Sequence, residues 1–400
     1  MTEQAKVPAI RFAGFTDPWE QRKLGELALT YSGGTPSAGN SAYYGGEIPF
    51  IRSAEIDCDS TELSLTVAGL NNSSAKLVDK GMVLYAMYGA TSGEVAISKI
   101  KGAINQAILA MDASDMAANR FIAYWLRRQK KSITETFLQG GQGNLSGAII
   151  KELGIPQPSL DEQRQIGSFF SNLDDLITLH QRKYDKLVVF KKSMLEKMFP
   201  KDGESVPEIR FAGFTDPWEQ RKFGELYRPV SEKNDVSFGR DKAISVANMY
   251  FNPAVYVTED SYLATYNVMR LGDIAFEGNR SKRFAHGRFV ENTIGDGIVS
   301  HVFKVFRHVG DNYDLSYWKH AINNEKLMKD VLTRSTKAST MMHELVTADF
   351  LEELTLVPSL NEQRAIGAAI DSIDNLITLH QRKLELLQNI KKSLLDKMFV

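Results

Sequence analysis

The sequence predicts an α+β protein in which two tandem α/β domains are separated by two long helices, with pseudo-twofold symmetry. Three observations predict this fold: two blocks recur at a spacing of about 200 residues, the segments between them diverge, and the longer block carries an unbroken apolar stripe of helical period. Solenoid repeats are only about 20–50 residues long. The duplication therefore indicates two modules with a common frame and different contents, which can form a twofold particle from one chain.

The two recurring blocks define the organisation of the chain. Residues 7–23 recur at 206–222 with one difference, Ala9 against Glu208, and residues 160–199 recur at 360–399 with 23 of 40 positions identical. We expect six segments in this order: a short constant segment (1–23), a first variable domain (24–158), a first helix (159–200), a repeated constant segment (201–222), a second variable domain (223–358) and a second helix (359–400).

The longer block predicts a helix of unusual length. Its first copy places apolar residues at steps of three and four, from Ile166 through Phe169 and Phe190 to Met198, and no proline interrupts it. Forty residues would make a rod of about 60 Å. The other copy is the expected cover for so long a stripe, although each helix could instead pack on its own domain. The expected seam residues are Leu173, Ile177, Leu187, Met194, Ile373, Ile377, Leu387 and Leu394.

Polar residues of these helices have ordinary structural interpretations. Asp161 and Asn361 resemble N-caps at the helix starts. His180 and His380 are expected inside the seam rather than as metal ligands. The pairs at 191–192 and 391–392 are all lysines and are expected on solvated flanks.

The variable domains are expected to be mixed α/β with a bias to strands. In the first, residues 48–51, 82–88, 95–97 and 107–111 have the apolar, β-branched character of strands, and residues 121–126 have that of a helix. The basic run 127–131 is expected to be the solvated end of that helix. Gly-rich polar loops connect these elements.

Some of these loops carry side chains suited to DNA. Residues 278–288 hold four cations, a histidine and no carboxylate, and residues 139–146 present Gln and Asn among glycines. Lys, Arg, Ser and Thr bind phosphates, whereas Arg, Asn and Gln read base edges; the alternative is that the loops are solvated turns. The candidate DNA-binding residues are Thr35, Ser37, Tyr88, Thr91, Ser92, Gln139, Gln142, Asn144, Asn279, Arg280, Lys282, Arg283, Arg288 and Lys337.

Composition and missing motifs exclude several classes of protein. Lys and Arg number 48 against 49 Asp and Glu, so the net charge of the whole chain does not indicate a polyanionic partner. The one cysteine, Cys58, excludes a disulfide framework or a Cys-rich zinc site. No window approaches the ~18 apolar residues of a spanning helix, and residues 1–6 lack an apolar signal core. Phosphate-binding loops, nucleophile elbows and His-Glu-x-x-His pairs are missing. We expect a cytoplasmic binding protein with no catalysis, metal or cofactor of its own.

Several motifs resemble one known family. They are Trp19–Leu27 with its echo at Trp218–Leu226, Gly33–Ser37 followed by Tyr43–Ile51, Met87–Thr91 with Asn105–Ala107, and Pro158–Ile166 repeated as Pro358–Ile366. Together with the doubled order of elements, they resemble the specificity subunit of type I restriction–modification systems over nearly the whole chain. The second variable domain lacks the Thr-Pro-Ser loop and the Tyr-Gly-Ala-Thr turn, so its contact residues are less defined.

The resemblance implies a role. Each variable domain would be a target recognition domain that reads one half of a bipartite, asymmetric site in double-stranded DNA. The helices would form an antiparallel coiled coil that sets the gap between the halves and docks two methyltransferase (modification) subunits. Restriction subunits with translocase activity would join that complex. Two alternatives are a coiled-coil scaffold without DNA contact and a nucleic-acid enzyme whose motifs have drifted.

Overall fold

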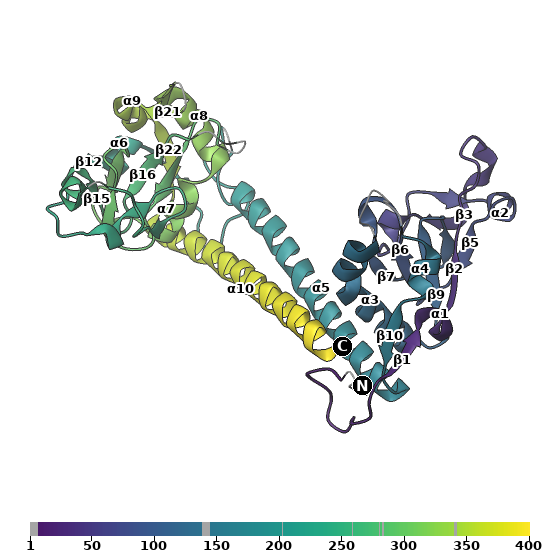
Figure 1. Cartoon of the computed structure of the whole chain (residues 1–400). Coiled ribbons are helices and arrows are strands. Elements are labelled where there is room, and N and C mark those ends of the chain that lie inside the picture. Colours follow the sequence, from purple (N-terminus) through teal and green to yellow (C-terminus); the bar gives the residue numbers. More distant parts are fainter. Residues whose placement is uncertain are drawn as a thin grey trace. The chain divides into compact units, whose positions relative to one another are not determined.

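The computed structural model describes residues 7–137, 145–201, 203–257, 259–279, 281, 284–339 and 342–400. The chain divides into two compact units. Unit 1 consists of Met1–Gln181 and Arg382–Val400, and unit 2 of Arg182–Gln381. Each unit thus holds one variable segment together with parts of both long helices (Figure 1).

Unit 1 is built on an antiparallel four-stranded sheet of order β2-β9-β6-β7. Its strands are β2 (Leu29–Ser32), β6 (Val83–Ala86), β7 (Val95–Ile97) and β9 (Ile108–Asp112). All of β6 is buried, because helix α3 (Met116–Phe137) packs on one face and a second sheet on the other. Burial on both faces explains why this strand is a continuous apolar run in the sequence.

The second sheet of unit 1 has the order β4-β3-β8-β5, with β3 and β8 parallel. The strands of this sheet are β3 (Tyr44–Ile51), β4 (Ser64–Leu65), β5 (Lys76–Val78) and β8 (Gly102–Ile104). The other elements of this unit are the helices α1 (Leu24–Leu27), α2 (Val67–Asn71) and α4 (Gly147–Lys151), and the paired strands β1 (Glu20–Lys23) and β10 (Gly154–Gln157).

Unit 2 repeats the frame of unit 1 on different residues. Its central sheet has the order β12-β19-β16-β17, which matches β2-β9-β6-β7 strand for strand. The strands are β12 (Tyr227–Val230), β16 (Ile274–Glu277), β17 (Arg288–Glu291) and β19 (Val305–His308). The two variable segments therefore share the order of their central sheet although their sequences have diverged.

The other elements of unit 2 are small. Three two-stranded sheets join β13 (Ile244–Ser245) to β14 (Tyr250–Phe251), β15 (Asn267–Met269) to β18 (Gly297–Val299), and β20 (Thr336–Ala338) to β21 (His343–Leu345). A fourth joins β11 (Glu219–Lys222) to β22 (Leu354–Val357). The short helices are α6 (Phe223–Leu226), α7 (Leu315–Ala321), α8 (Glu325–Ser335) and α9 (Thr347–Glu352).

Two long helices, α5 (Leu160–Lys197) and α10 (Leu360–Met398), pass from one unit to the other. In unit 1 the first part of α5 packs with the last part of α10, and in unit 2 the first part of α10 packs with the last part of α5. The helices are therefore antiparallel, as expected. Their N-caps differ from the expectation: Asp161 lies inside the first turn, and the Ser159 hydroxyl accepts the Glu162 N–H at 3.4 Å.

The buried stripe of the helices is a heptad pattern that differs in part from the expected one. Phe170 is fully buried and Phe190 is 48% exposed, so the inward positions run through 170 rather than 169 and through 191 rather than 190. Spacing of 3.5 residues is the signature of coiled-coil packing. Lys191 and Lys391 therefore fall on the inward phase, and both are half-buried rather than on solvated flanks.

The residues at the C-terminal ends of the long helices pack in the hydrophobic cores of the units. The ring centroids of Phe399 and Trp19 lie 6.5 Å apart in unit 1, and those of Phe199 and Trp218 lie 6.2 Å apart in unit 2. Among the described residues, no helix is long and apolar enough to cross a membrane.

Candidate nucleic-acid interface

Two of the predicted DNA-binding loops of unit 1 bond to the turn between β8 and β9, and Leu145 bonds to one of these loops. Thr35 donates its hydroxyl hydrogen bond to the Gln106 side chain. The Met87 amide donates to the Ala107 carbonyl at 2.8 Å, and the Leu145 amide donates to the Met87 carbonyl at 3.0 Å. The turn thus holds together loops that lie far apart in the sequence.

Two glycines allow the first of these loops to lie against β8. A Cβ on Gly33 would stand 1.9 Å from the Ile104 carbonyl oxygen, and one on Gly34 would stand 2.0 Å from the Ser74 hydroxyl. The loop then carries Thr35 and Ser37 outward, and both are exposed. Backbone approach that only glycine permits is a feature of loops with a fixed position.

The second loop is the turn after β6. Tyr88, Thr91 and Ser92 are half-buried there, and the Ser92 hydroxyl donates to the Met87 carbonyl at 3.0 Å. The turn rests on α3, since Lys130 pairs with Glu94. Gln139, Gln142 and Asn144 lie outside the described residues.

The equivalent region of unit 2 joins the β16–β17 loop to the β20–β21 hairpin. The His343 amide donates to the Gly278 carbonyl at 2.8 Å, and the rings of His286 and His343 lie 4.9 Å apart. Asn279 and Lys337 are both exposed. Arg280, Lys282 and Arg283 lie outside the described residues.

Arg288 is held by internal contacts. Its guanidinium pairs with the buried Glu277 at 2.7 Å and donates to the Ala247 carbonyl at 2.6 Å. Its position is therefore fixed, and part of its charge is neutralised inside the protein. A role for Arg288 in DNA contact remains a prediction.

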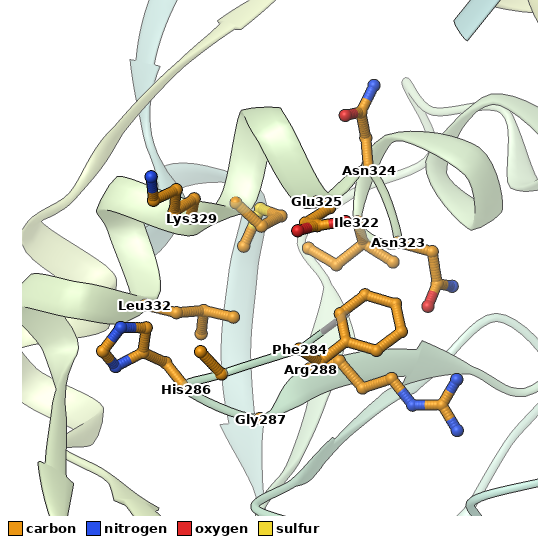
Figure 2. A pocket seen from close by; sticks show the side chains of 12 residues that line it. Phe284, His286, Gly287, Arg288, Ile322, Asn323, Asn324, Glu325, Lys329 and Leu332 are labelled. Atoms are coloured by element: carbon orange, nitrogen blue, oxygen red, sulfur yellow. The ribbon is translucent and has the colours of Figure 1, made fainter. Parts of the chain in front are cut away.

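A small cavity lies beneath this loop (Figure 2). It measures about 90 Å³ and separates residues 284–288 from α8. Phe284, Ile322 and Leu332 give it apolar walls. In Figure 2, His286 and Lys329 lie toward one side and Arg288 and Asn323 toward the other.

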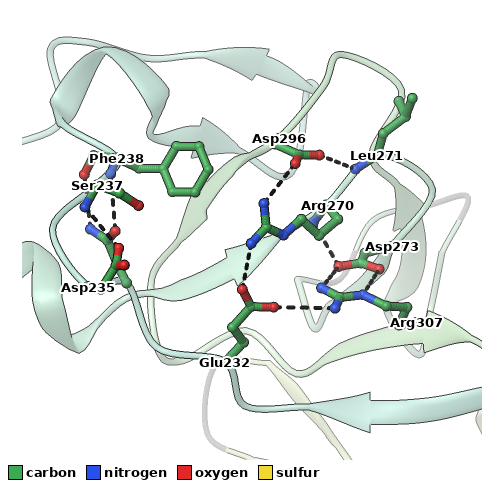
Figure 3. A network of polar contacts seen from close by, with 10 residues as sticks. Glu232, Asp235, Ser237, Phe238, Arg270, Leu271, Asp273, Asp296 and Arg307 are labelled. Carbon is green, nitrogen blue, oxygen red and sulfur yellow. Dashed lines mark hydrogen bonds and ion pairs between the residues drawn. The ribbon is translucent and has the colours of Figure 1, made fainter.

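An ion-pair network of unit 2 was not expected from the sequence (Figure 3). Arg270 bonds to Glu232 at 2.6 Å and to Asp296 at 2.9 Å, and Arg307 makes two bonds of 2.8 Å to Asp273. Burial is the main cause that raises the pKa of Asp273, against the opposing effect of Arg307. Because both guanidiniums are occupied by carboxylates, the network connects strands and leaves little charge for phosphate.

A possible metal-ligand set is occupied by cations of the protein. His320, Asp371 and Asp374 bring ligand atoms within 4.8 Å of one another, the one such group among the described residues. Lys319 lies 2.5 Å from Asp371, and Lys191 lies 2.6 Å from Asp374. These ammonium groups neutralise the carboxylates, so the cluster is better explained as an ion-pair junction than as a metal site.

The seam residues lie where the helices pack. Leu173 is buried in the core of unit 1, where Ile177, Leu387 and Leu394 pack around it, and Met194 packs against the core of unit 2. The remaining seam residues, Leu187, Ile373 and Ile377, are half-buried.

The basic run after residue 126 departs from expectation. α3 continues to Phe137, so residues 127–131 lie within the helix rather than at its end. Arg127 donates to the Val95 carbonyl at 3.0 Å, and Arg128 lies 3.9 Å from Asp396. These arginines join α3 to its neighbours instead of facing solvent.

Comparisons by sequence and by fold both find specificity subunits of type I restriction–modification systems. A family model described as "Type I restriction modification DNA specificity domain" matches residues 16–188. The MjaVIII and MjaIX specificity subunits of Methanocaldococcus jannaschii are 22% and 21% identical to this chain, each over 95% of it and 92% of their own lengths. Over most of its length this chain is therefore similar to the specificity subunits of type I restriction–modification systems.

Solved structures share the specificity-subunit fold. An S subunit from M. genitalium aligns over 99% of both chains with a TM-score of 0.64 and 16% identity. A chain solved in work on complex assembly of the type I system aligns over 95% of this chain and 97% of its own length, with a TM-score of 0.51 and 15% identity.

The sequence named Asn105–Ala107 as a motif but not as candidate DNA-binding residues. Asn105 and Gln106 lie in the turn to which two loops of unit 1 bond, and Gln106 is exposed. Their position in a short turn between two buried apolar strands was the signal that could have identified them.

Proposed function

We propose that this chain is the specificity subunit of a type I restriction–modification system, that it is a non-catalytic DNA reader, and that each variable domain recognises one half of a bipartite, asymmetric site in double-stranded DNA. The observation that carries the proposal is the repeated sheet frame: β2-β9-β6-β7 and β12-β19-β16-β17 have the same order but support different loops. A common frame with unlike loops suits two half-sites of different sequence.

The loop chemistry supports this role. In unit 1, exposed Thr35, Ser37 and Gln106 surround one turn, and hydroxyl and amide groups can contact phosphates or base edges. In unit 2, exposed Asn279 and Lys337 lie on the joined loop and hairpin. Different donors and acceptors in the two units favour different base sequences.

We propose further that the long helices dock two methyltransferase subunits. Each helix carries exposed apolar residues away from the buried stripe, and large exposed patches of this kind mark interaction sites. The residues are Leu176, Leu179, Val188, Val189 and Phe190 on α5, and Leu376, Leu379, Leu386 and Ile390 on α10. Leu176, Leu179 and Phe190 recur as Leu376, Leu379 and Ile390, and this repetition suits two copies of one partner. Restriction and translocase subunits would join this complex in the cytoplasm.

A domain exchange tests the function. Residues 24–158 are replaced by the corresponding segment of another specificity subunit, and the chimaera is expressed with its modification subunits. Methylome sequencing is expected to show one changed half-site, with the other half-site and the gap retained. Loss of dependence on either half-site, or two changed half-sites, would contradict the proposal. A scaffold without DNA contact would leave the methylated sequence unchanged.

A further inference from the structure

Two ion pairs join the long helices in symmetry-related positions. In unit 1, Asp174 of α5 pairs with Lys391 of α10. In unit 2, Lys191 of α5 pairs with Asp374 of α10, with bonds of 2.6 and 2.7 Å. Asp174 and Asp374 are equivalent positions of the duplicated blocks, as are Lys191 and Lys391, because the blocks are offset by 200 residues. The same antiparallel register is therefore fixed once in each unit.

The apolar stripe alone does not select this register. A heptad pattern repeats every seven residues, so a slip of one heptad keeps apolar residues facing apolar residues. Such a slip would bring Gly167 or Gln181, in place of Asp174, opposite Lys391. Neither residue can pair with an ammonium group as a carboxylate does. The slipped register would thus leave a half-buried lysine without its counter-charge.

The carboxylate of Asp174 also bonds to the variable domain of its unit, and that of Asp374 lies close to the variable domain of the other. Tyr124 of α3 donates its hydroxyl to Asp174 at 2.8 Å, and Arg127 lies 3.5 Å from the same carboxylate. In unit 2, His320 of α7 lies 3.9 Å from Asp374 and 2.9 Å from the neighbouring Asp371. One carboxylate therefore connects the helix register to the helix that packs on the sheet.

We propose that the Asp174–Lys391 and Lys191–Asp374 pairs form a register lock, and that these four positioning residues determine the gap between the two half-sites. The inference rests on the proposed function, because the gap has meaning only if each variable domain reads DNA. Polar residues at core positions of coiled coils commonly specify register at some expense of stability. A one-heptad slip moves a helix about 10 Å along its axis, a shift comparable with a few base pairs.

The test removes the lock with substitutions close in shape to the original residues. The quadruple variant carries Lys191→Met, Lys391→Met, Asp174→Asn and Asp374→Asn. The full-length chain is purified with its modification subunits, and methylation is measured on a series of duplexes whose half-sites are separated by the native gap or by about one to four base pairs more or fewer. Lys192→Met with Lys392→Met is the matched control, because these neighbouring lysines are exposed.

The wild type and the control are expected to prefer the native gap. The quadruple variant is expected to lose that preference by about tenfold or more, while its base preference within each half-site is retained. Its thermal midpoint is expected to be unchanged or raised, since apolar replacement of such pairs is often neutral or stabilising. A purely structural role would instead lower the midpoint and leave the gap preference unaltered.

Two half-lock variants, each lacking one pair, complete the test. They are expected to broaden the accepted gap by a smaller factor, and they provide the result if the quadruple variant does not assemble. Native gap preference in the quadruple variant, or in both half-lock variants, would overturn the register lock. A wild-type complex that does not require both half-sites would instead refute the proposed function.

Discussion

The Arg11 guanidinium donates two hydrogen bonds of 2.8 and 2.7 Å to the Glu162 carboxylate, and so connects the N-terminal constant segment to the start of α5. Glu162 is almost wholly buried. The duplicated segment repeats the contact, because Arg210 makes bonds of 2.8 and 2.7 Å to Glu362. The two nearly identical short blocks thus make the same contact with the start of a long helix, one in each unit.

Removal of this anchor is expected to destabilise unit 1. Arg11→Ala leaves a buried carboxylate without its counter-charge and is expected to lower the free energy of unfolding by about 3–5 kcal/mol. Chemical denaturation of the full chain measures the loss. The exposed pair of Arg22 and Glu26 provides the control, since Arg22→Ala is expected to cost less than about 1 kcal/mol. Equal effects of the two substitutions would contradict the anchor.

The two constant tryptophans are expected to respond differently to substitution. Trp19 donates its indole N–H to Glu162 at 3.1 Å, whereas the indole nitrogen of Trp218 is buried without a partner among the described residues. Trp19→Phe removes a hydrogen bond to a charged group, worth about 1.5–3 kcal/mol. Trp218→Phe removes only an unsatisfied donor and should cost less. Thermal unfolding of both variants checks the order.

A buried carboxylate is expected to make unit 2 sensitive to alkaline pH. Glu291 is almost wholly buried, and burial raises its pKa to about 9. The unfolded state releases this proton near the ordinary value of 4.5, so its stabilising contribution is complete below pH 4.5 and is lost as pH rises toward 9. One proton corresponds to about 1.4 kcal/mol per pH unit.

Glu291→Gln is expected to remove that slope. The neutral amide should make unit 2 more stable than in the wild type, by a margin that grows between pH 5 and about 9. Hydrogen exchange of the amides in β17 measures unit 2 without the other unit. Glu344→Gln, at an exposed position of β21, should follow the wild type. Parallel curves for Glu291→Gln and the wild type would show that Glu291 is already ionised in the folded state.

Gly33 is expected to be essential for one reader loop. Gly33→Ala would force the loop away from the Ile104 carbonyl, since its Cβ would stand 1.9 Å from that oxygen. Binding to the first half-site should fall by about tenfold or more. Gly39→Ala is the control, because nothing lies within 4 Å of a Cβ there. Quantitative methylation of a duplex series reports both variants, and equal loss at both positions would exclude a fixed loop.

A four-residue helical insertion between residues 185 and 190 is expected to alter the gap. It would lengthen the rod by about 6 Å, which corresponds to a change of one or two base pairs because B-DNA rises about 3.4 Å per pair. Methylome sequencing of the insertion variant gives the new gap directly. An unaltered gap would show that the helices do not set the spacing.

The sequence predicted the two modules and the paired helices, but not all of the inward helix positions or the ion pairs. The repeat and the apolar period identified two modules and two paired helices, since both properties are local or exactly duplicated. The period could not choose between adjacent apolar residues such as Phe169 and Phe170. It also assigned Lys191 to a solvated flank, because its counter-charge, Asp374, lies far away in the sequence. Likewise, the bonds of Arg270, which directly follows β15, can be identified only when Glu232 and Asp296 are placed beside it.

The most direct measurement of DNA recognition by the two variable domains uses a chain with two identical readers. Residues 24–158 are replaced by a second copy of residues 223–358, and the methylome of cells that express this chain with its modification subunits is sequenced. Because the helices are antiparallel, we expect an inverted repeat of the second half-site at the native gap. A direct repeat, or a site that still contains the original first half, would contradict it.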